Sequence, residues 1–331
     1  MTPEFNLIAR YFTRPTKRAV LGIGDDCALI KVAVGCELAI STDTLVEGIH
    51  FFAGADAEKL GHKSLAVNLS DLAAMGATPR YVTLALTLPS IDNAWLAAFS
   101  RGFFALADEF DVELIGGDTT RGPLSITLTV MGEIEAGRAL RRDGAKAGDD
   151  IWVSGTLGGA ALALMHMQNK IQLQPHIFAC VEDRLHRPSP RVALGKTLLG
   201  IASAVIDISD GLVADLSHIC ERSKLSAVIE RDLLPLASSL MSVREDLREG
   251  LINECSLSGG DDYELCFPAS VAARAEIEIA GAKCGVAVTR IGAMKIFDPN
   301  QLVKVIDEYG QDVSPKKFGY DHFAATPAIS I

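Results

Sequence analysis

Residues 114–122, LIGGDTTRG, combine two adjacent glycines with a carboxylate, two hydroxyl groups and a guanidinium group. Apolar residues precede the glycines, so we expect a buried strand that ends in a tight turn at Gly116 and Gly117. Asp118 would then lie at the carboxyl end of a strand, where open α/β folds bind their ligands. A carboxylate beside hydroxyl and backbone N–H groups suits a hard cation that carries a phosphate. The alternative for this stretch alone is a turn with a solvated acid.

Similar groups of acids, hydroxyls and glycines recur along the chain. Asp25 and Asp26 follow two glycines, and their adjacent charges require a cation or solvent to compensate them. Asp71 interrupts the apolar run of a predicted helix, where an unpaired carboxylate is costly unless it binds a metal. For Ser209 or Asp210, the alternative is an N-cap of the following helix. The other candidates lie where predicted strands meet polar turns, and they are Ser41, Thr42, Asp43, Asp207, Asp261 and Asp262.

The candidate residues together indicate one class of chemistry. If the acids converge, their mutual repulsion requires divalent cations, and ligands that are all oxygen favour magnesium over zinc or copper. The seven histidines form no H-E-x-x-H motif and no close pair, which argues against zinc catalysis. The sequence has no P-loop and no G-x-S-x-G motif. The pattern therefore favours metal-assisted phosphate chemistry.

The composition is typical of a globular protein, with 49% hydrophobic and 22% charged residues among 331. A net charge of −11 removes any general attraction to nucleic acid or anionic lipid, although metal ions can still bridge carboxylates to phosphates. The seven cysteines are dispersed, the N-terminus has no apolar signal core, and no apolar run is long enough to span a bilayer. We therefore expect a cytoplasmic protein without a nucleic-acid or membrane partner.

The hydrophobic pattern and the length predict two α/β domains joined by a linker. The first domain, residues 1–136, is expected to contain helices over residues 5–12, 58–75 and 92–110 and strands over residues 38–44, 81–88, 112–115 and 124–134. Residues 137–150 form a polar linker that supplies Arg138, Arg141 and Arg142. An arginine there is suited to bind a phosphate, and the alternative is a solvated turn.

The second domain, residues 151–331, repeats the same arrangement of acids beside strands. We expect helices over residues 181–186, 192–199, 212–220 and 272–283, and strands over residues 151–153, 204–208, 263–267 and 286–294. The aromatic tail, residues 319–323, is expected to fold back onto a neighbouring segment.

Seven segments of the chain, taken together, resemble the bacterial thiamine-monophosphate kinases of the aminoimidazole-ribonucleotide-synthetase-like superfamily. Each segment is a weak signal alone, but the ordered set covers almost the whole chain with compatible spacing. The segments are LGIGDDCA (21–28), ISTDTLVEGIH (40–50), NLSDLAAMGA (68–77), LIGGDTTRGPL (114–124), IDISDGL (206–212), SGGDDYELCF (258–267) and GYDHF (319–323).

The resemblance implies an α/β (α+β) fold of two domains, in which the first domain forms a sheet or barrel with that of a second copy in a homodimer. It implies transfer of the ATP γ-phosphoryl group to thiamine monophosphate, with several Mg²⁺ ions. It implies metal ligands at Asp26, Ser41, Thr42, Asp43, Asp71, Asp118, Asp207 and Asp210. It implies ATP contacts at Gly117, Asp118, Arg142 and Ser209, and substrate contacts at His50, Asp261 and Tyr320. The residues with catalytic roles would be Asp71, Asp118, Arg142 and Asp210.

Two assignments and two rival functions stay open. Either Asp25 or Asp26 is the metal ligand, and we choose Asp26. Many relatives carry Glu where Asp261 stands, and the shorter side chain would move a thiamine contact outward or route it through water. One rival is a sibling enzyme, such as a formylglycinamidine-ribonucleotide cyclase or a selenophosphate synthetase, although Cys27 is the only N-terminal match to the nucleophile of the latter. The other rival is a binder of nucleotide or thiamine phosphate that has no catalytic activity.

Overall fold

The computed structural model describes residues 2–243, 245–316 and 319–320. The chain divides into two compact units. The first comprises the described residues of Met1–Leu72 and Ala77–Gly137, and the second those of Ala73–Gly76 and Arg138–Ala324. Most of the aromatic tail, residues 321–323, lies outside the described residues, so the expected packing of those three residues stays a prediction.

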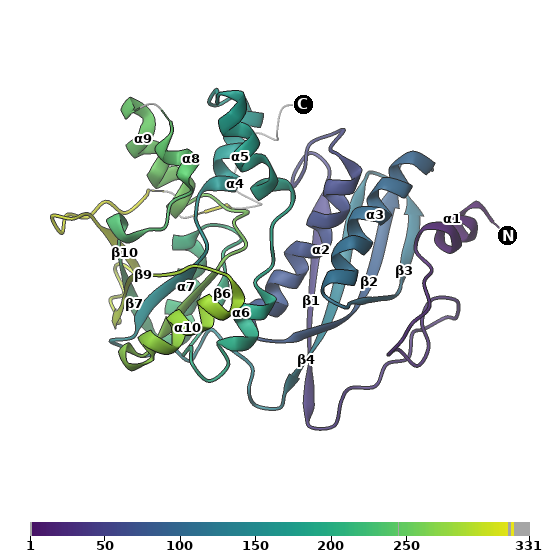
Figure 1. Ribbon diagram of the computed structural model, residues 1–331, viewed down its shortest axis with the longest axis horizontal. Coiled ribbons are helices and arrows are strands. Elements are labelled where there is room, and N and C mark those ends of the chain that lie inside the picture. Colours follow the sequence, from purple (N-terminus) through teal and green to yellow (C-terminus); the bar gives the residue numbers. More distant parts are fainter. Residues whose placement is uncertain (1, 244, 317–318, 321–331) are drawn as a thin grey trace. The chain divides into compact units, whose positions relative to one another are not determined.

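The first unit contains a four-stranded sheet (Figure 1). Its strands β1 and β2 are antiparallel to β4, whereas β3 runs parallel to β2. In spatial order they are β1 (Cys36–Val46), β4 (Ser125–Glu135), β2 (Thr78–Leu88) and β3 (Glu113–Arg121).

Two long helices, α2 (Ala57–Ala74) and α3 (Asn93–Glu109), lie against one face of this sheet (Figure 1). They approach closely at two glycines, because a Cβ on Gly61 would lie 2.1 Å from the Phe99 carbonyl oxygen and one on Gly102 would lie 1.8 Å from that of Glu58. On α3, Phe99 and Phe103 are fully buried and belong to the core. The short helix α1 (Pro3–Tyr11) packs near α3 and β3.

The face of the sheet opposite α2 and α3 carries threonines. Thr42 and Thr129 share a hydrogen bond of 2.8 Å between β1 and β4, and Thr44 and Thr127 share one of 2.9 Å. Ile40 on the same face is 61% exposed. Because side chains alternate along a strand, β4 presents buried residues to the helices and these threonines to the other side.

The second unit is built on a six-stranded sheet in which β10 and β7 are parallel and the other four neighbouring pairs of the described strands are antiparallel. In spatial order the strands are β10 (Val303–Ile306), β7 (Leu225–Glu230), β9 (Val288–Ile296), β5 (Asp150–Ser154), β8 (Leu265–Ala269) and β6 (Ile206–Asp207). A buried cluster that includes Ile151, Leu216, Ile229 and Ile291 forms its core.

The helices of the second unit pack around this sheet and against one another (Figure 1). A π-helical turn, η2 (Asn253–Leu257), follows α9 directly, and the short 3₁₀ turns η1 (Arg231–Leu233) and η3 (Val271–Ala273) precede α8 and α10. The α-helices are α4 (Gly159–Met167), α5 (Pro175–His186), α6 (Val192–Thr197), α7 (Leu212–Ser223), α8 (Ser238–Met241), α9 (Glu245–Ile252) and α10 (Arg274–Cys284).

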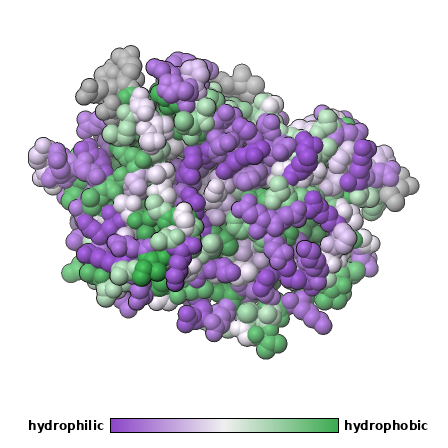
Figure 2. Space-filling model, viewed as in Figure 1, coloured by the Kyte–Doolittle hydropathy of each residue, from purple (hydrophilic) through white to green (hydrophobic). Residues whose placement is uncertain are grey.

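Among the described residues, no helix combines the length and the apolar character needed to cross a membrane. Hydrophilic and hydrophobic residues are interspersed over the face seen in Figure 2. This surface agrees with a chain in which charged residues make up 22% of the sequence.

The predictions that two polar segments follow strand ends are wrong. β3 does not turn at Gly116 and Gly117 but continues to Arg121, because Gly117 allows the strand to stay closely paired with β2. β1 continues to Val46, so the segment with Ser41 and Asp43 lies in the middle of a strand. In both strands, pairing with a neighbour satisfies the backbone and keeps polar residues in the sheet.

Candidate active site

Two hydrogen bonds join α2 to β1 in the first unit. The Ser41 hydroxyl donates to Asp71 Oδ2 at 2.5 Å, and the Asp43 backbone N–H donates to Asn68 Oδ1 at 3.2 Å. Residues three apart share a helix face and residues two apart share a strand face, so the two pairs follow from these periodicities. The contacts thereby gather three predicted metal ligands, Ser41, Asp43 and Asp71, on the face of β1 that α2 covers.

Two other predicted metal ligands of the first unit present their side chains to the opposite face. Thr42 is exposed and hydrogen-bonds Thr129. Asp118 is also exposed. It pairs with Ala85 of β2, and Ala85 pairs with Thr127 of β4, so Asp118 lies on the same face as the threonines. The structure therefore separates the side chains of Thr42 and Asp118 from those of Ser41, Asp43 and Asp71.

Gly117 marks a point where β3 approaches β2 very closely. Its φ is +146°, which a side chain would disfavour. A Cβ at this position would lie 1.8 Å from the Leu84 carbonyl oxygen. Only glycine fits here, so Gly117 sets the path of the strand just before Asp118.

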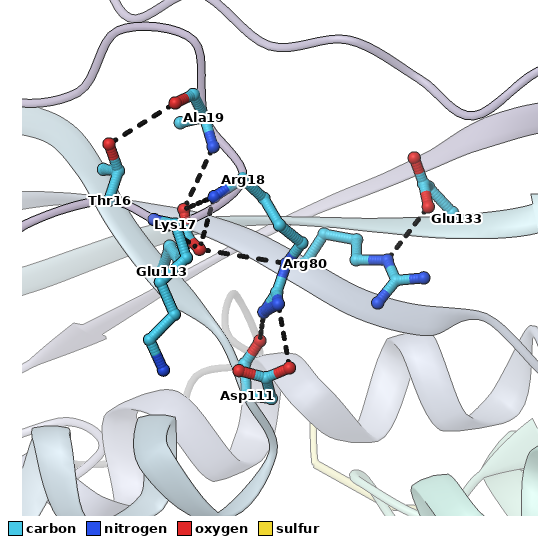
Figure 3. Close-up of polar contacts among 8 residues, drawn as sticks. All are labelled: Thr16, Lys17, Arg18, Ala19, Arg80, Asp111, Glu113 and Glu133. Atoms are coloured by element: carbon cyan, nitrogen blue, oxygen red, sulfur yellow. Dashed lines mark hydrogen bonds and ion pairs between the residues drawn. The ribbon is translucent and has the colours of Figure 1, made fainter.

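A single carboxylate anchors the segment that precedes the predicted metal ligands Asp25 and Asp26. Glu113 on β3 accepts hydrogen bonds from three consecutive backbone N–H groups, of Lys17 at 3.0 Å, Arg18 at 2.9 Å and Ala19 at 3.1 Å (Figure 3). The Arg18 guanidinium also donates to Asp111 Oδ2 at 2.8 Å. The start of the loop with the paired acids is thus fixed to the sheet.

The paired acids lie in a turn that uses the carboxylate of Asp25. Asp25 Oδ1 accepts a hydrogen bond from the Asp26 backbone N–H at 2.9 Å, so the Asp25 carboxylate is used within its own turn. Both side chains are exposed.

His50 is fixed by the turn after β1. Its Nδ1 accepts a hydrogen bond from the Val46 backbone N–H at 2.9 Å. An accepting Nδ1 carries no proton, so the neutral ring has its proton on Nε2. The only donor of the neutral His50 ring is therefore Nε2–H.

In the second unit, a buried acid that the sequence analysis missed holds the loop after β6. Asp215 Oδ2 accepts hydrogen bonds from three consecutive backbone N–H groups, of Ser209 at 3.0 Å, Asp210 at 3.1 Å and Gly211 at 3.1 Å. Burial, together with the charges of Asp207 and Asp210, raises the pKa of Asp215 to about 8, and the N–H groups of Gly211 and Asp210 oppose the rise. The signal in the sequence was the position of Asp215, four residues after Gly211 and within the predicted helix over residues 212–220.

Two distant segments meet this loop through main-chain hydrogen bonds. The Asp261 N–H donates to the Ser209 carbonyl at 2.9 Å, and the Tyr320 N–H donates to the Asp210 carbonyl at 3.3 Å. Gly260 is required for this approach, because a Cβ there would lie 2.3 Å from the Ser209 oxygen. The second unit therefore brings four predicted site residues together, namely Ser209, Asp210, Asp261 and Tyr320.

Two neighbouring acids of the same segment are buried and structural. Asp262 Oδ2 accepts a hydrogen bond from the Gly158 N–H at the start of α4, at 2.8 Å. Glu264 forms a two-pronged pair with Arg191 at 2.6 Å for both contacts and accepts from Arg184 at 2.8 Å. These contacts hold the segment that carries Asp261, whose φ of +68° is unusual for a residue other than glycine.

A cavity of about 430 Å³ opens in the second unit beside this meeting point. Its wall includes the apolar side chains of Leu164 and Met165, the aromatic ring of Tyr320, and the amides of Gln168 and Asn253. Its size and mixed lining are typical of a small-molecule site. The π-helical turn η2, which carries Asn253, is a type of irregularity that recurs at functional sites.

The arginines of the segment after the first unit differ in their contacts. Arg141 is paired with Asp143 through two hydrogen bonds of 2.9 and 2.6 Å. Arg142 has an exposed side chain, and its carbonyl accepts a hydrogen bond from Ser223 Oγ at 2.8 Å. Ser223, at the end of α7, thus fixes the backbone that carries Arg142.

The donor atoms of the predicted metal ligands are carboxylate and hydroxyl oxygens, which fit Mg²⁺. Within the part of the chain that the structure describes, no three His, Cys, Asp or Glu side chains form a group that could hold a metal ion. Mg²⁺ is usually bound by one or two carboxylates, with phosphate oxygens and water as the other ligands. The arrangement thus agrees with metal ions that bind together with a phosphate substrate.

Comparisons with known proteins agree with this chemistry. The family model described as "AIR synthase related protein, N-terminal domain" matches residues 24–134. The thiamine-monophosphate kinase of Salmonella typhimurium is 49% identical over 325 residues, which cover 97% of this chain and 98% of the relative. The crystal structure of thiamine-monophosphate kinase from Stenotrophomonas maltophilia K279a is 45% identical, has a TM-score of 0.82, and covers 91% of this chain and 94% of its own. The structure of AaThiL complexed with AMPPCP and TMP is 30% identical, with a TM-score of 0.76 and coverage of 91% and 92%.

Proposed function

The chain belongs to the thiamine-monophosphate kinase family, and we propose that it transfers the γ-phosphoryl group of ATP to the phosphate of thiamine monophosphate. The products are thiamine diphosphate and ADP. The observation that carries the proposal is the meeting of Ser209 and Asp210 with Asp261 and Tyr320 in the second unit. The resemblance assigns the first pair to nucleotide and metal, and the second pair to the thiamine substrate.

The cavity beside Tyr320 supports a substrate with a flat heteroaromatic part. Its apolar wall suits a ring system, and the Tyr320 side chain can stack on one. The polar amides at the wall suit ring nitrogens and amino groups. Asp261, next to the glycines of the same wall, would contact the substrate from the strained segment.

We assign Mg²⁺ to the acids of both units. Asp71 with Ser41 and Asp43 would hold metal on one face of β1, and Asp207 with Asp210 would hold it after β6. We retain Thr42 and Asp118 as metal ligands. Their side chains would bind metal on the face of the sheet opposite α2 and α3. For the acid pair, we favour Asp26, because the Asp25 carboxylate already accepts a hydrogen bond within its turn. When bound, Mg²⁺ neutralises phosphate charge during transfer.

The reaction needs no general base from the protein. The acceptor is a phosphate oxygen, whose second pKa is about 6, so it is ionised near neutral pH. The resemblance assigns His50 to the substrate, and the neutral ring would act there as a hydrogen-bond donor and not as a base, because Nδ1 accepts from the Val46 N–H. The barrier is the repulsion between two polyanions, so Arg142 and the metal-binding acids act through charge and position.

We further propose a homodimer in the cytoplasm. The threonine face with the exposed Ile40 is suited to meet the same face of a second copy. All seven cysteines are free thiols, as is usual in a reducing compartment. Sedimentation of the protein and of an Ile40→Glu variant tests the dimer, because a charge on this face would shift a dimer towards monomers.

Incubation with ATP, Mg²⁺ and thiamine monophosphate, followed by chromatography, tests the function. We expect thiamine diphosphate from the monophosphate and none from thiamine. Product from thiamine would require a base and would contradict the proposed acceptor. Binding without turnover would favour the non-catalytic alternative, and turnover of formylglycinamidine ribonucleotide or selenide instead would favour the sibling enzymes.

A further inference from the structure

We propose that Asp215 is a positioning residue, which orients the loop of Ser209 and Asp210 and thereby holds the substrate-binding segments in register with it. This inference rests on the proposed function for the roles of those residues. Asp215 itself is 3% exposed and lies in the first turn of α7. We therefore expect it to act through the loop and not by contact with a ligand.

The hydrogen bonds of Asp215 fix three consecutive peptide planes. Its Oδ2 accepts from the N–H groups of Ser209, Asp210 and Gly211. In a trans peptide, the N–H and the preceding C=O point in opposite directions. One buried oxygen therefore directs three carbonyl groups, those of Ile208, Ser209 and Asp210, away from α7.

Each of these three carbonyls binds a segment of the candidate site. The Ile208 carbonyl accepts from the Tyr263 N–H at 2.8 Å, the Ser209 carbonyl from Asp261 at 2.9 Å, and the Asp210 carbonyl from Tyr320 at 3.3 Å. The same peptide planes thus carry the predicted metal and nucleotide residues and hold the predicted substrate residues. Asp215 controls both through one set of hydrogen bonds.

Three convergent N–H groups are also a typical binding site for an anion. Here the carboxyl group of Asp215 occupies them. The backbone of this loop is therefore not available to a phosphate, and the side chains of Ser209 and Asp210 make the contacts that the proposed function requires.

The test replaces Asp215 with leucine, which is also branched at Cγ but accepts no hydrogen bond, and with asparagine, which has the same size and keeps an acceptor oxygen. The matched control is Asp150→Leu, since Asp150 in the same unit is also 3% exposed and is paired with Arg274 at 2.6 Å, away from the loop. For Asp215→Leu we expect kcat/KM to fall on the order of 10²-fold, as is typical of misplaced groups. We also expect weaker binding of AMPPCP with Mg²⁺, and recovery of most of both in Asp215→Asn.

Hydrogen exchange gives a readout that does not need turnover. In Asp215→Leu, amides of residues 209–211 and of residues 261–263 should exchange faster together, whereas Asp150→Leu should leave both segments protected. If Asp215→Leu only loses stability, as Asp150→Leu does, and keeps its exchange pattern and its affinity for AMPPCP, the proposal is wrong. If the native enzyme lacks turnover, the proposed function fails, but exchange still decides the positioning role.

A second variant covers the case in which Asp215→Leu does not fold. Gly260→Ala places a methyl group 2.3 Å from the Ser209 oxygen, so it breaks the contact to Asp261 from the other side of the loop. We expect the same loss of affinity for AMPPCP with Mg²⁺ and faster exchange at residues 209–211. Native affinity and native exchange in this variant would contradict the proposed coupling between the loop of residues 209–211 and the segment of Asp261.

Discussion

The replacement Asp262→Asn should change the pH dependence of stability in the second unit. Asp262 is 4% exposed, and its Oδ2 accepts from the Gly158 N–H, whereas its Oδ1 has no hydrogen-bond partner among the described residues. Burial, with a smaller contribution from the charge of Glu264, raises the pKa of Asp262 from 3.8 to about 7 against the lowering effects of the Gly158 N–H and Arg184.

The sign and size of the effect follow from linkage between protonation and folding. Above pH 3.8 the unfolded chain releases the proton of Asp262, but the folded chain keeps it up to about pH 7. The stability from this group is therefore complete below pH 3.8 and is lost as the pH rises to about 7. A difference of about three pKa units, at about 1.4 kcal/mol each, amounts to about 4 kcal/mol.

Urea unfolding of both proteins across this pH range measures the effect. A Trp95→Phe background leaves Trp152, buried in β5, as the only tryptophan, so its fluorescence reports on the second unit. We expect the unfolding free energy of the native protein, relative to Asp262→Asn, to fall by about 4 kcal/mol between about pH 4 and pH 7. A difference that stays constant with pH would mean that the folded chain keeps Asp262 ionised, and would refute the reasoning.

Three further outcomes are expected. Asp71→Asn should lower kcat on the order of 10²-fold or more in a steady-state assay while thermal unfolding stays near that of the native protein; near-normal turnover would exclude a metal role for Asp71. Gly102→Ala should destabilise the first unit by about 3 kcal/mol in urea, because its Cβ would lie 1.8 Å from the Glu58 oxygen; the control Gly250→Ala, with nothing within 4 Å in an exposed turn of α9, should be neutral or stabilise by up to about 1 kcal/mol. Removal of metal with EDTA should abolish turnover and added Mg²⁺ should restore it; activity that persists in EDTA would contradict the metal assignment.

Local signals in the sequence were sufficient for the elements with strong caps and stripes. α3 has Asp92 as N-cap, which accepts from the N–H groups of Ala94 and Trp95, and its Phe99 and Phe103, at helical spacing, are buried. α2 ends close to Gly76, whose φ of +71° suits a helix stop. These features depend on neighbours within one or two turns, so the sequence contains them.

The ends of strands, and the faces on which their side chains lie, were harder to predict from the sequence. The glycines in β3 indicated a turn, but Gly117 serves the close approach of β3 to β2, which depends on a strand elsewhere in the chain. The separation of Thr42 from Ser41 and Asp43 could have been predicted, because alternation along a strand places them on opposite faces. The contact of Asp215 with the loop is local and had a signal in its position after Gly211, but the coupling role could not be predicted, because it depends on where the loop after β6 meets two distant segments.

The most direct test of the central claim uses ATP labelled with ¹⁸O at the three non-bridging γ-oxygens, together with Mg²⁺ and thiamine monophosphate. Mass spectrometry of the thiamine diphosphate should find all three labels in the terminal phosphate, as direct transfer to the substrate phosphate requires. Absence of labelled thiamine diphosphate, with labelled inorganic phosphate released instead, would contradict the claim that this chain is a thiamine-monophosphate kinase.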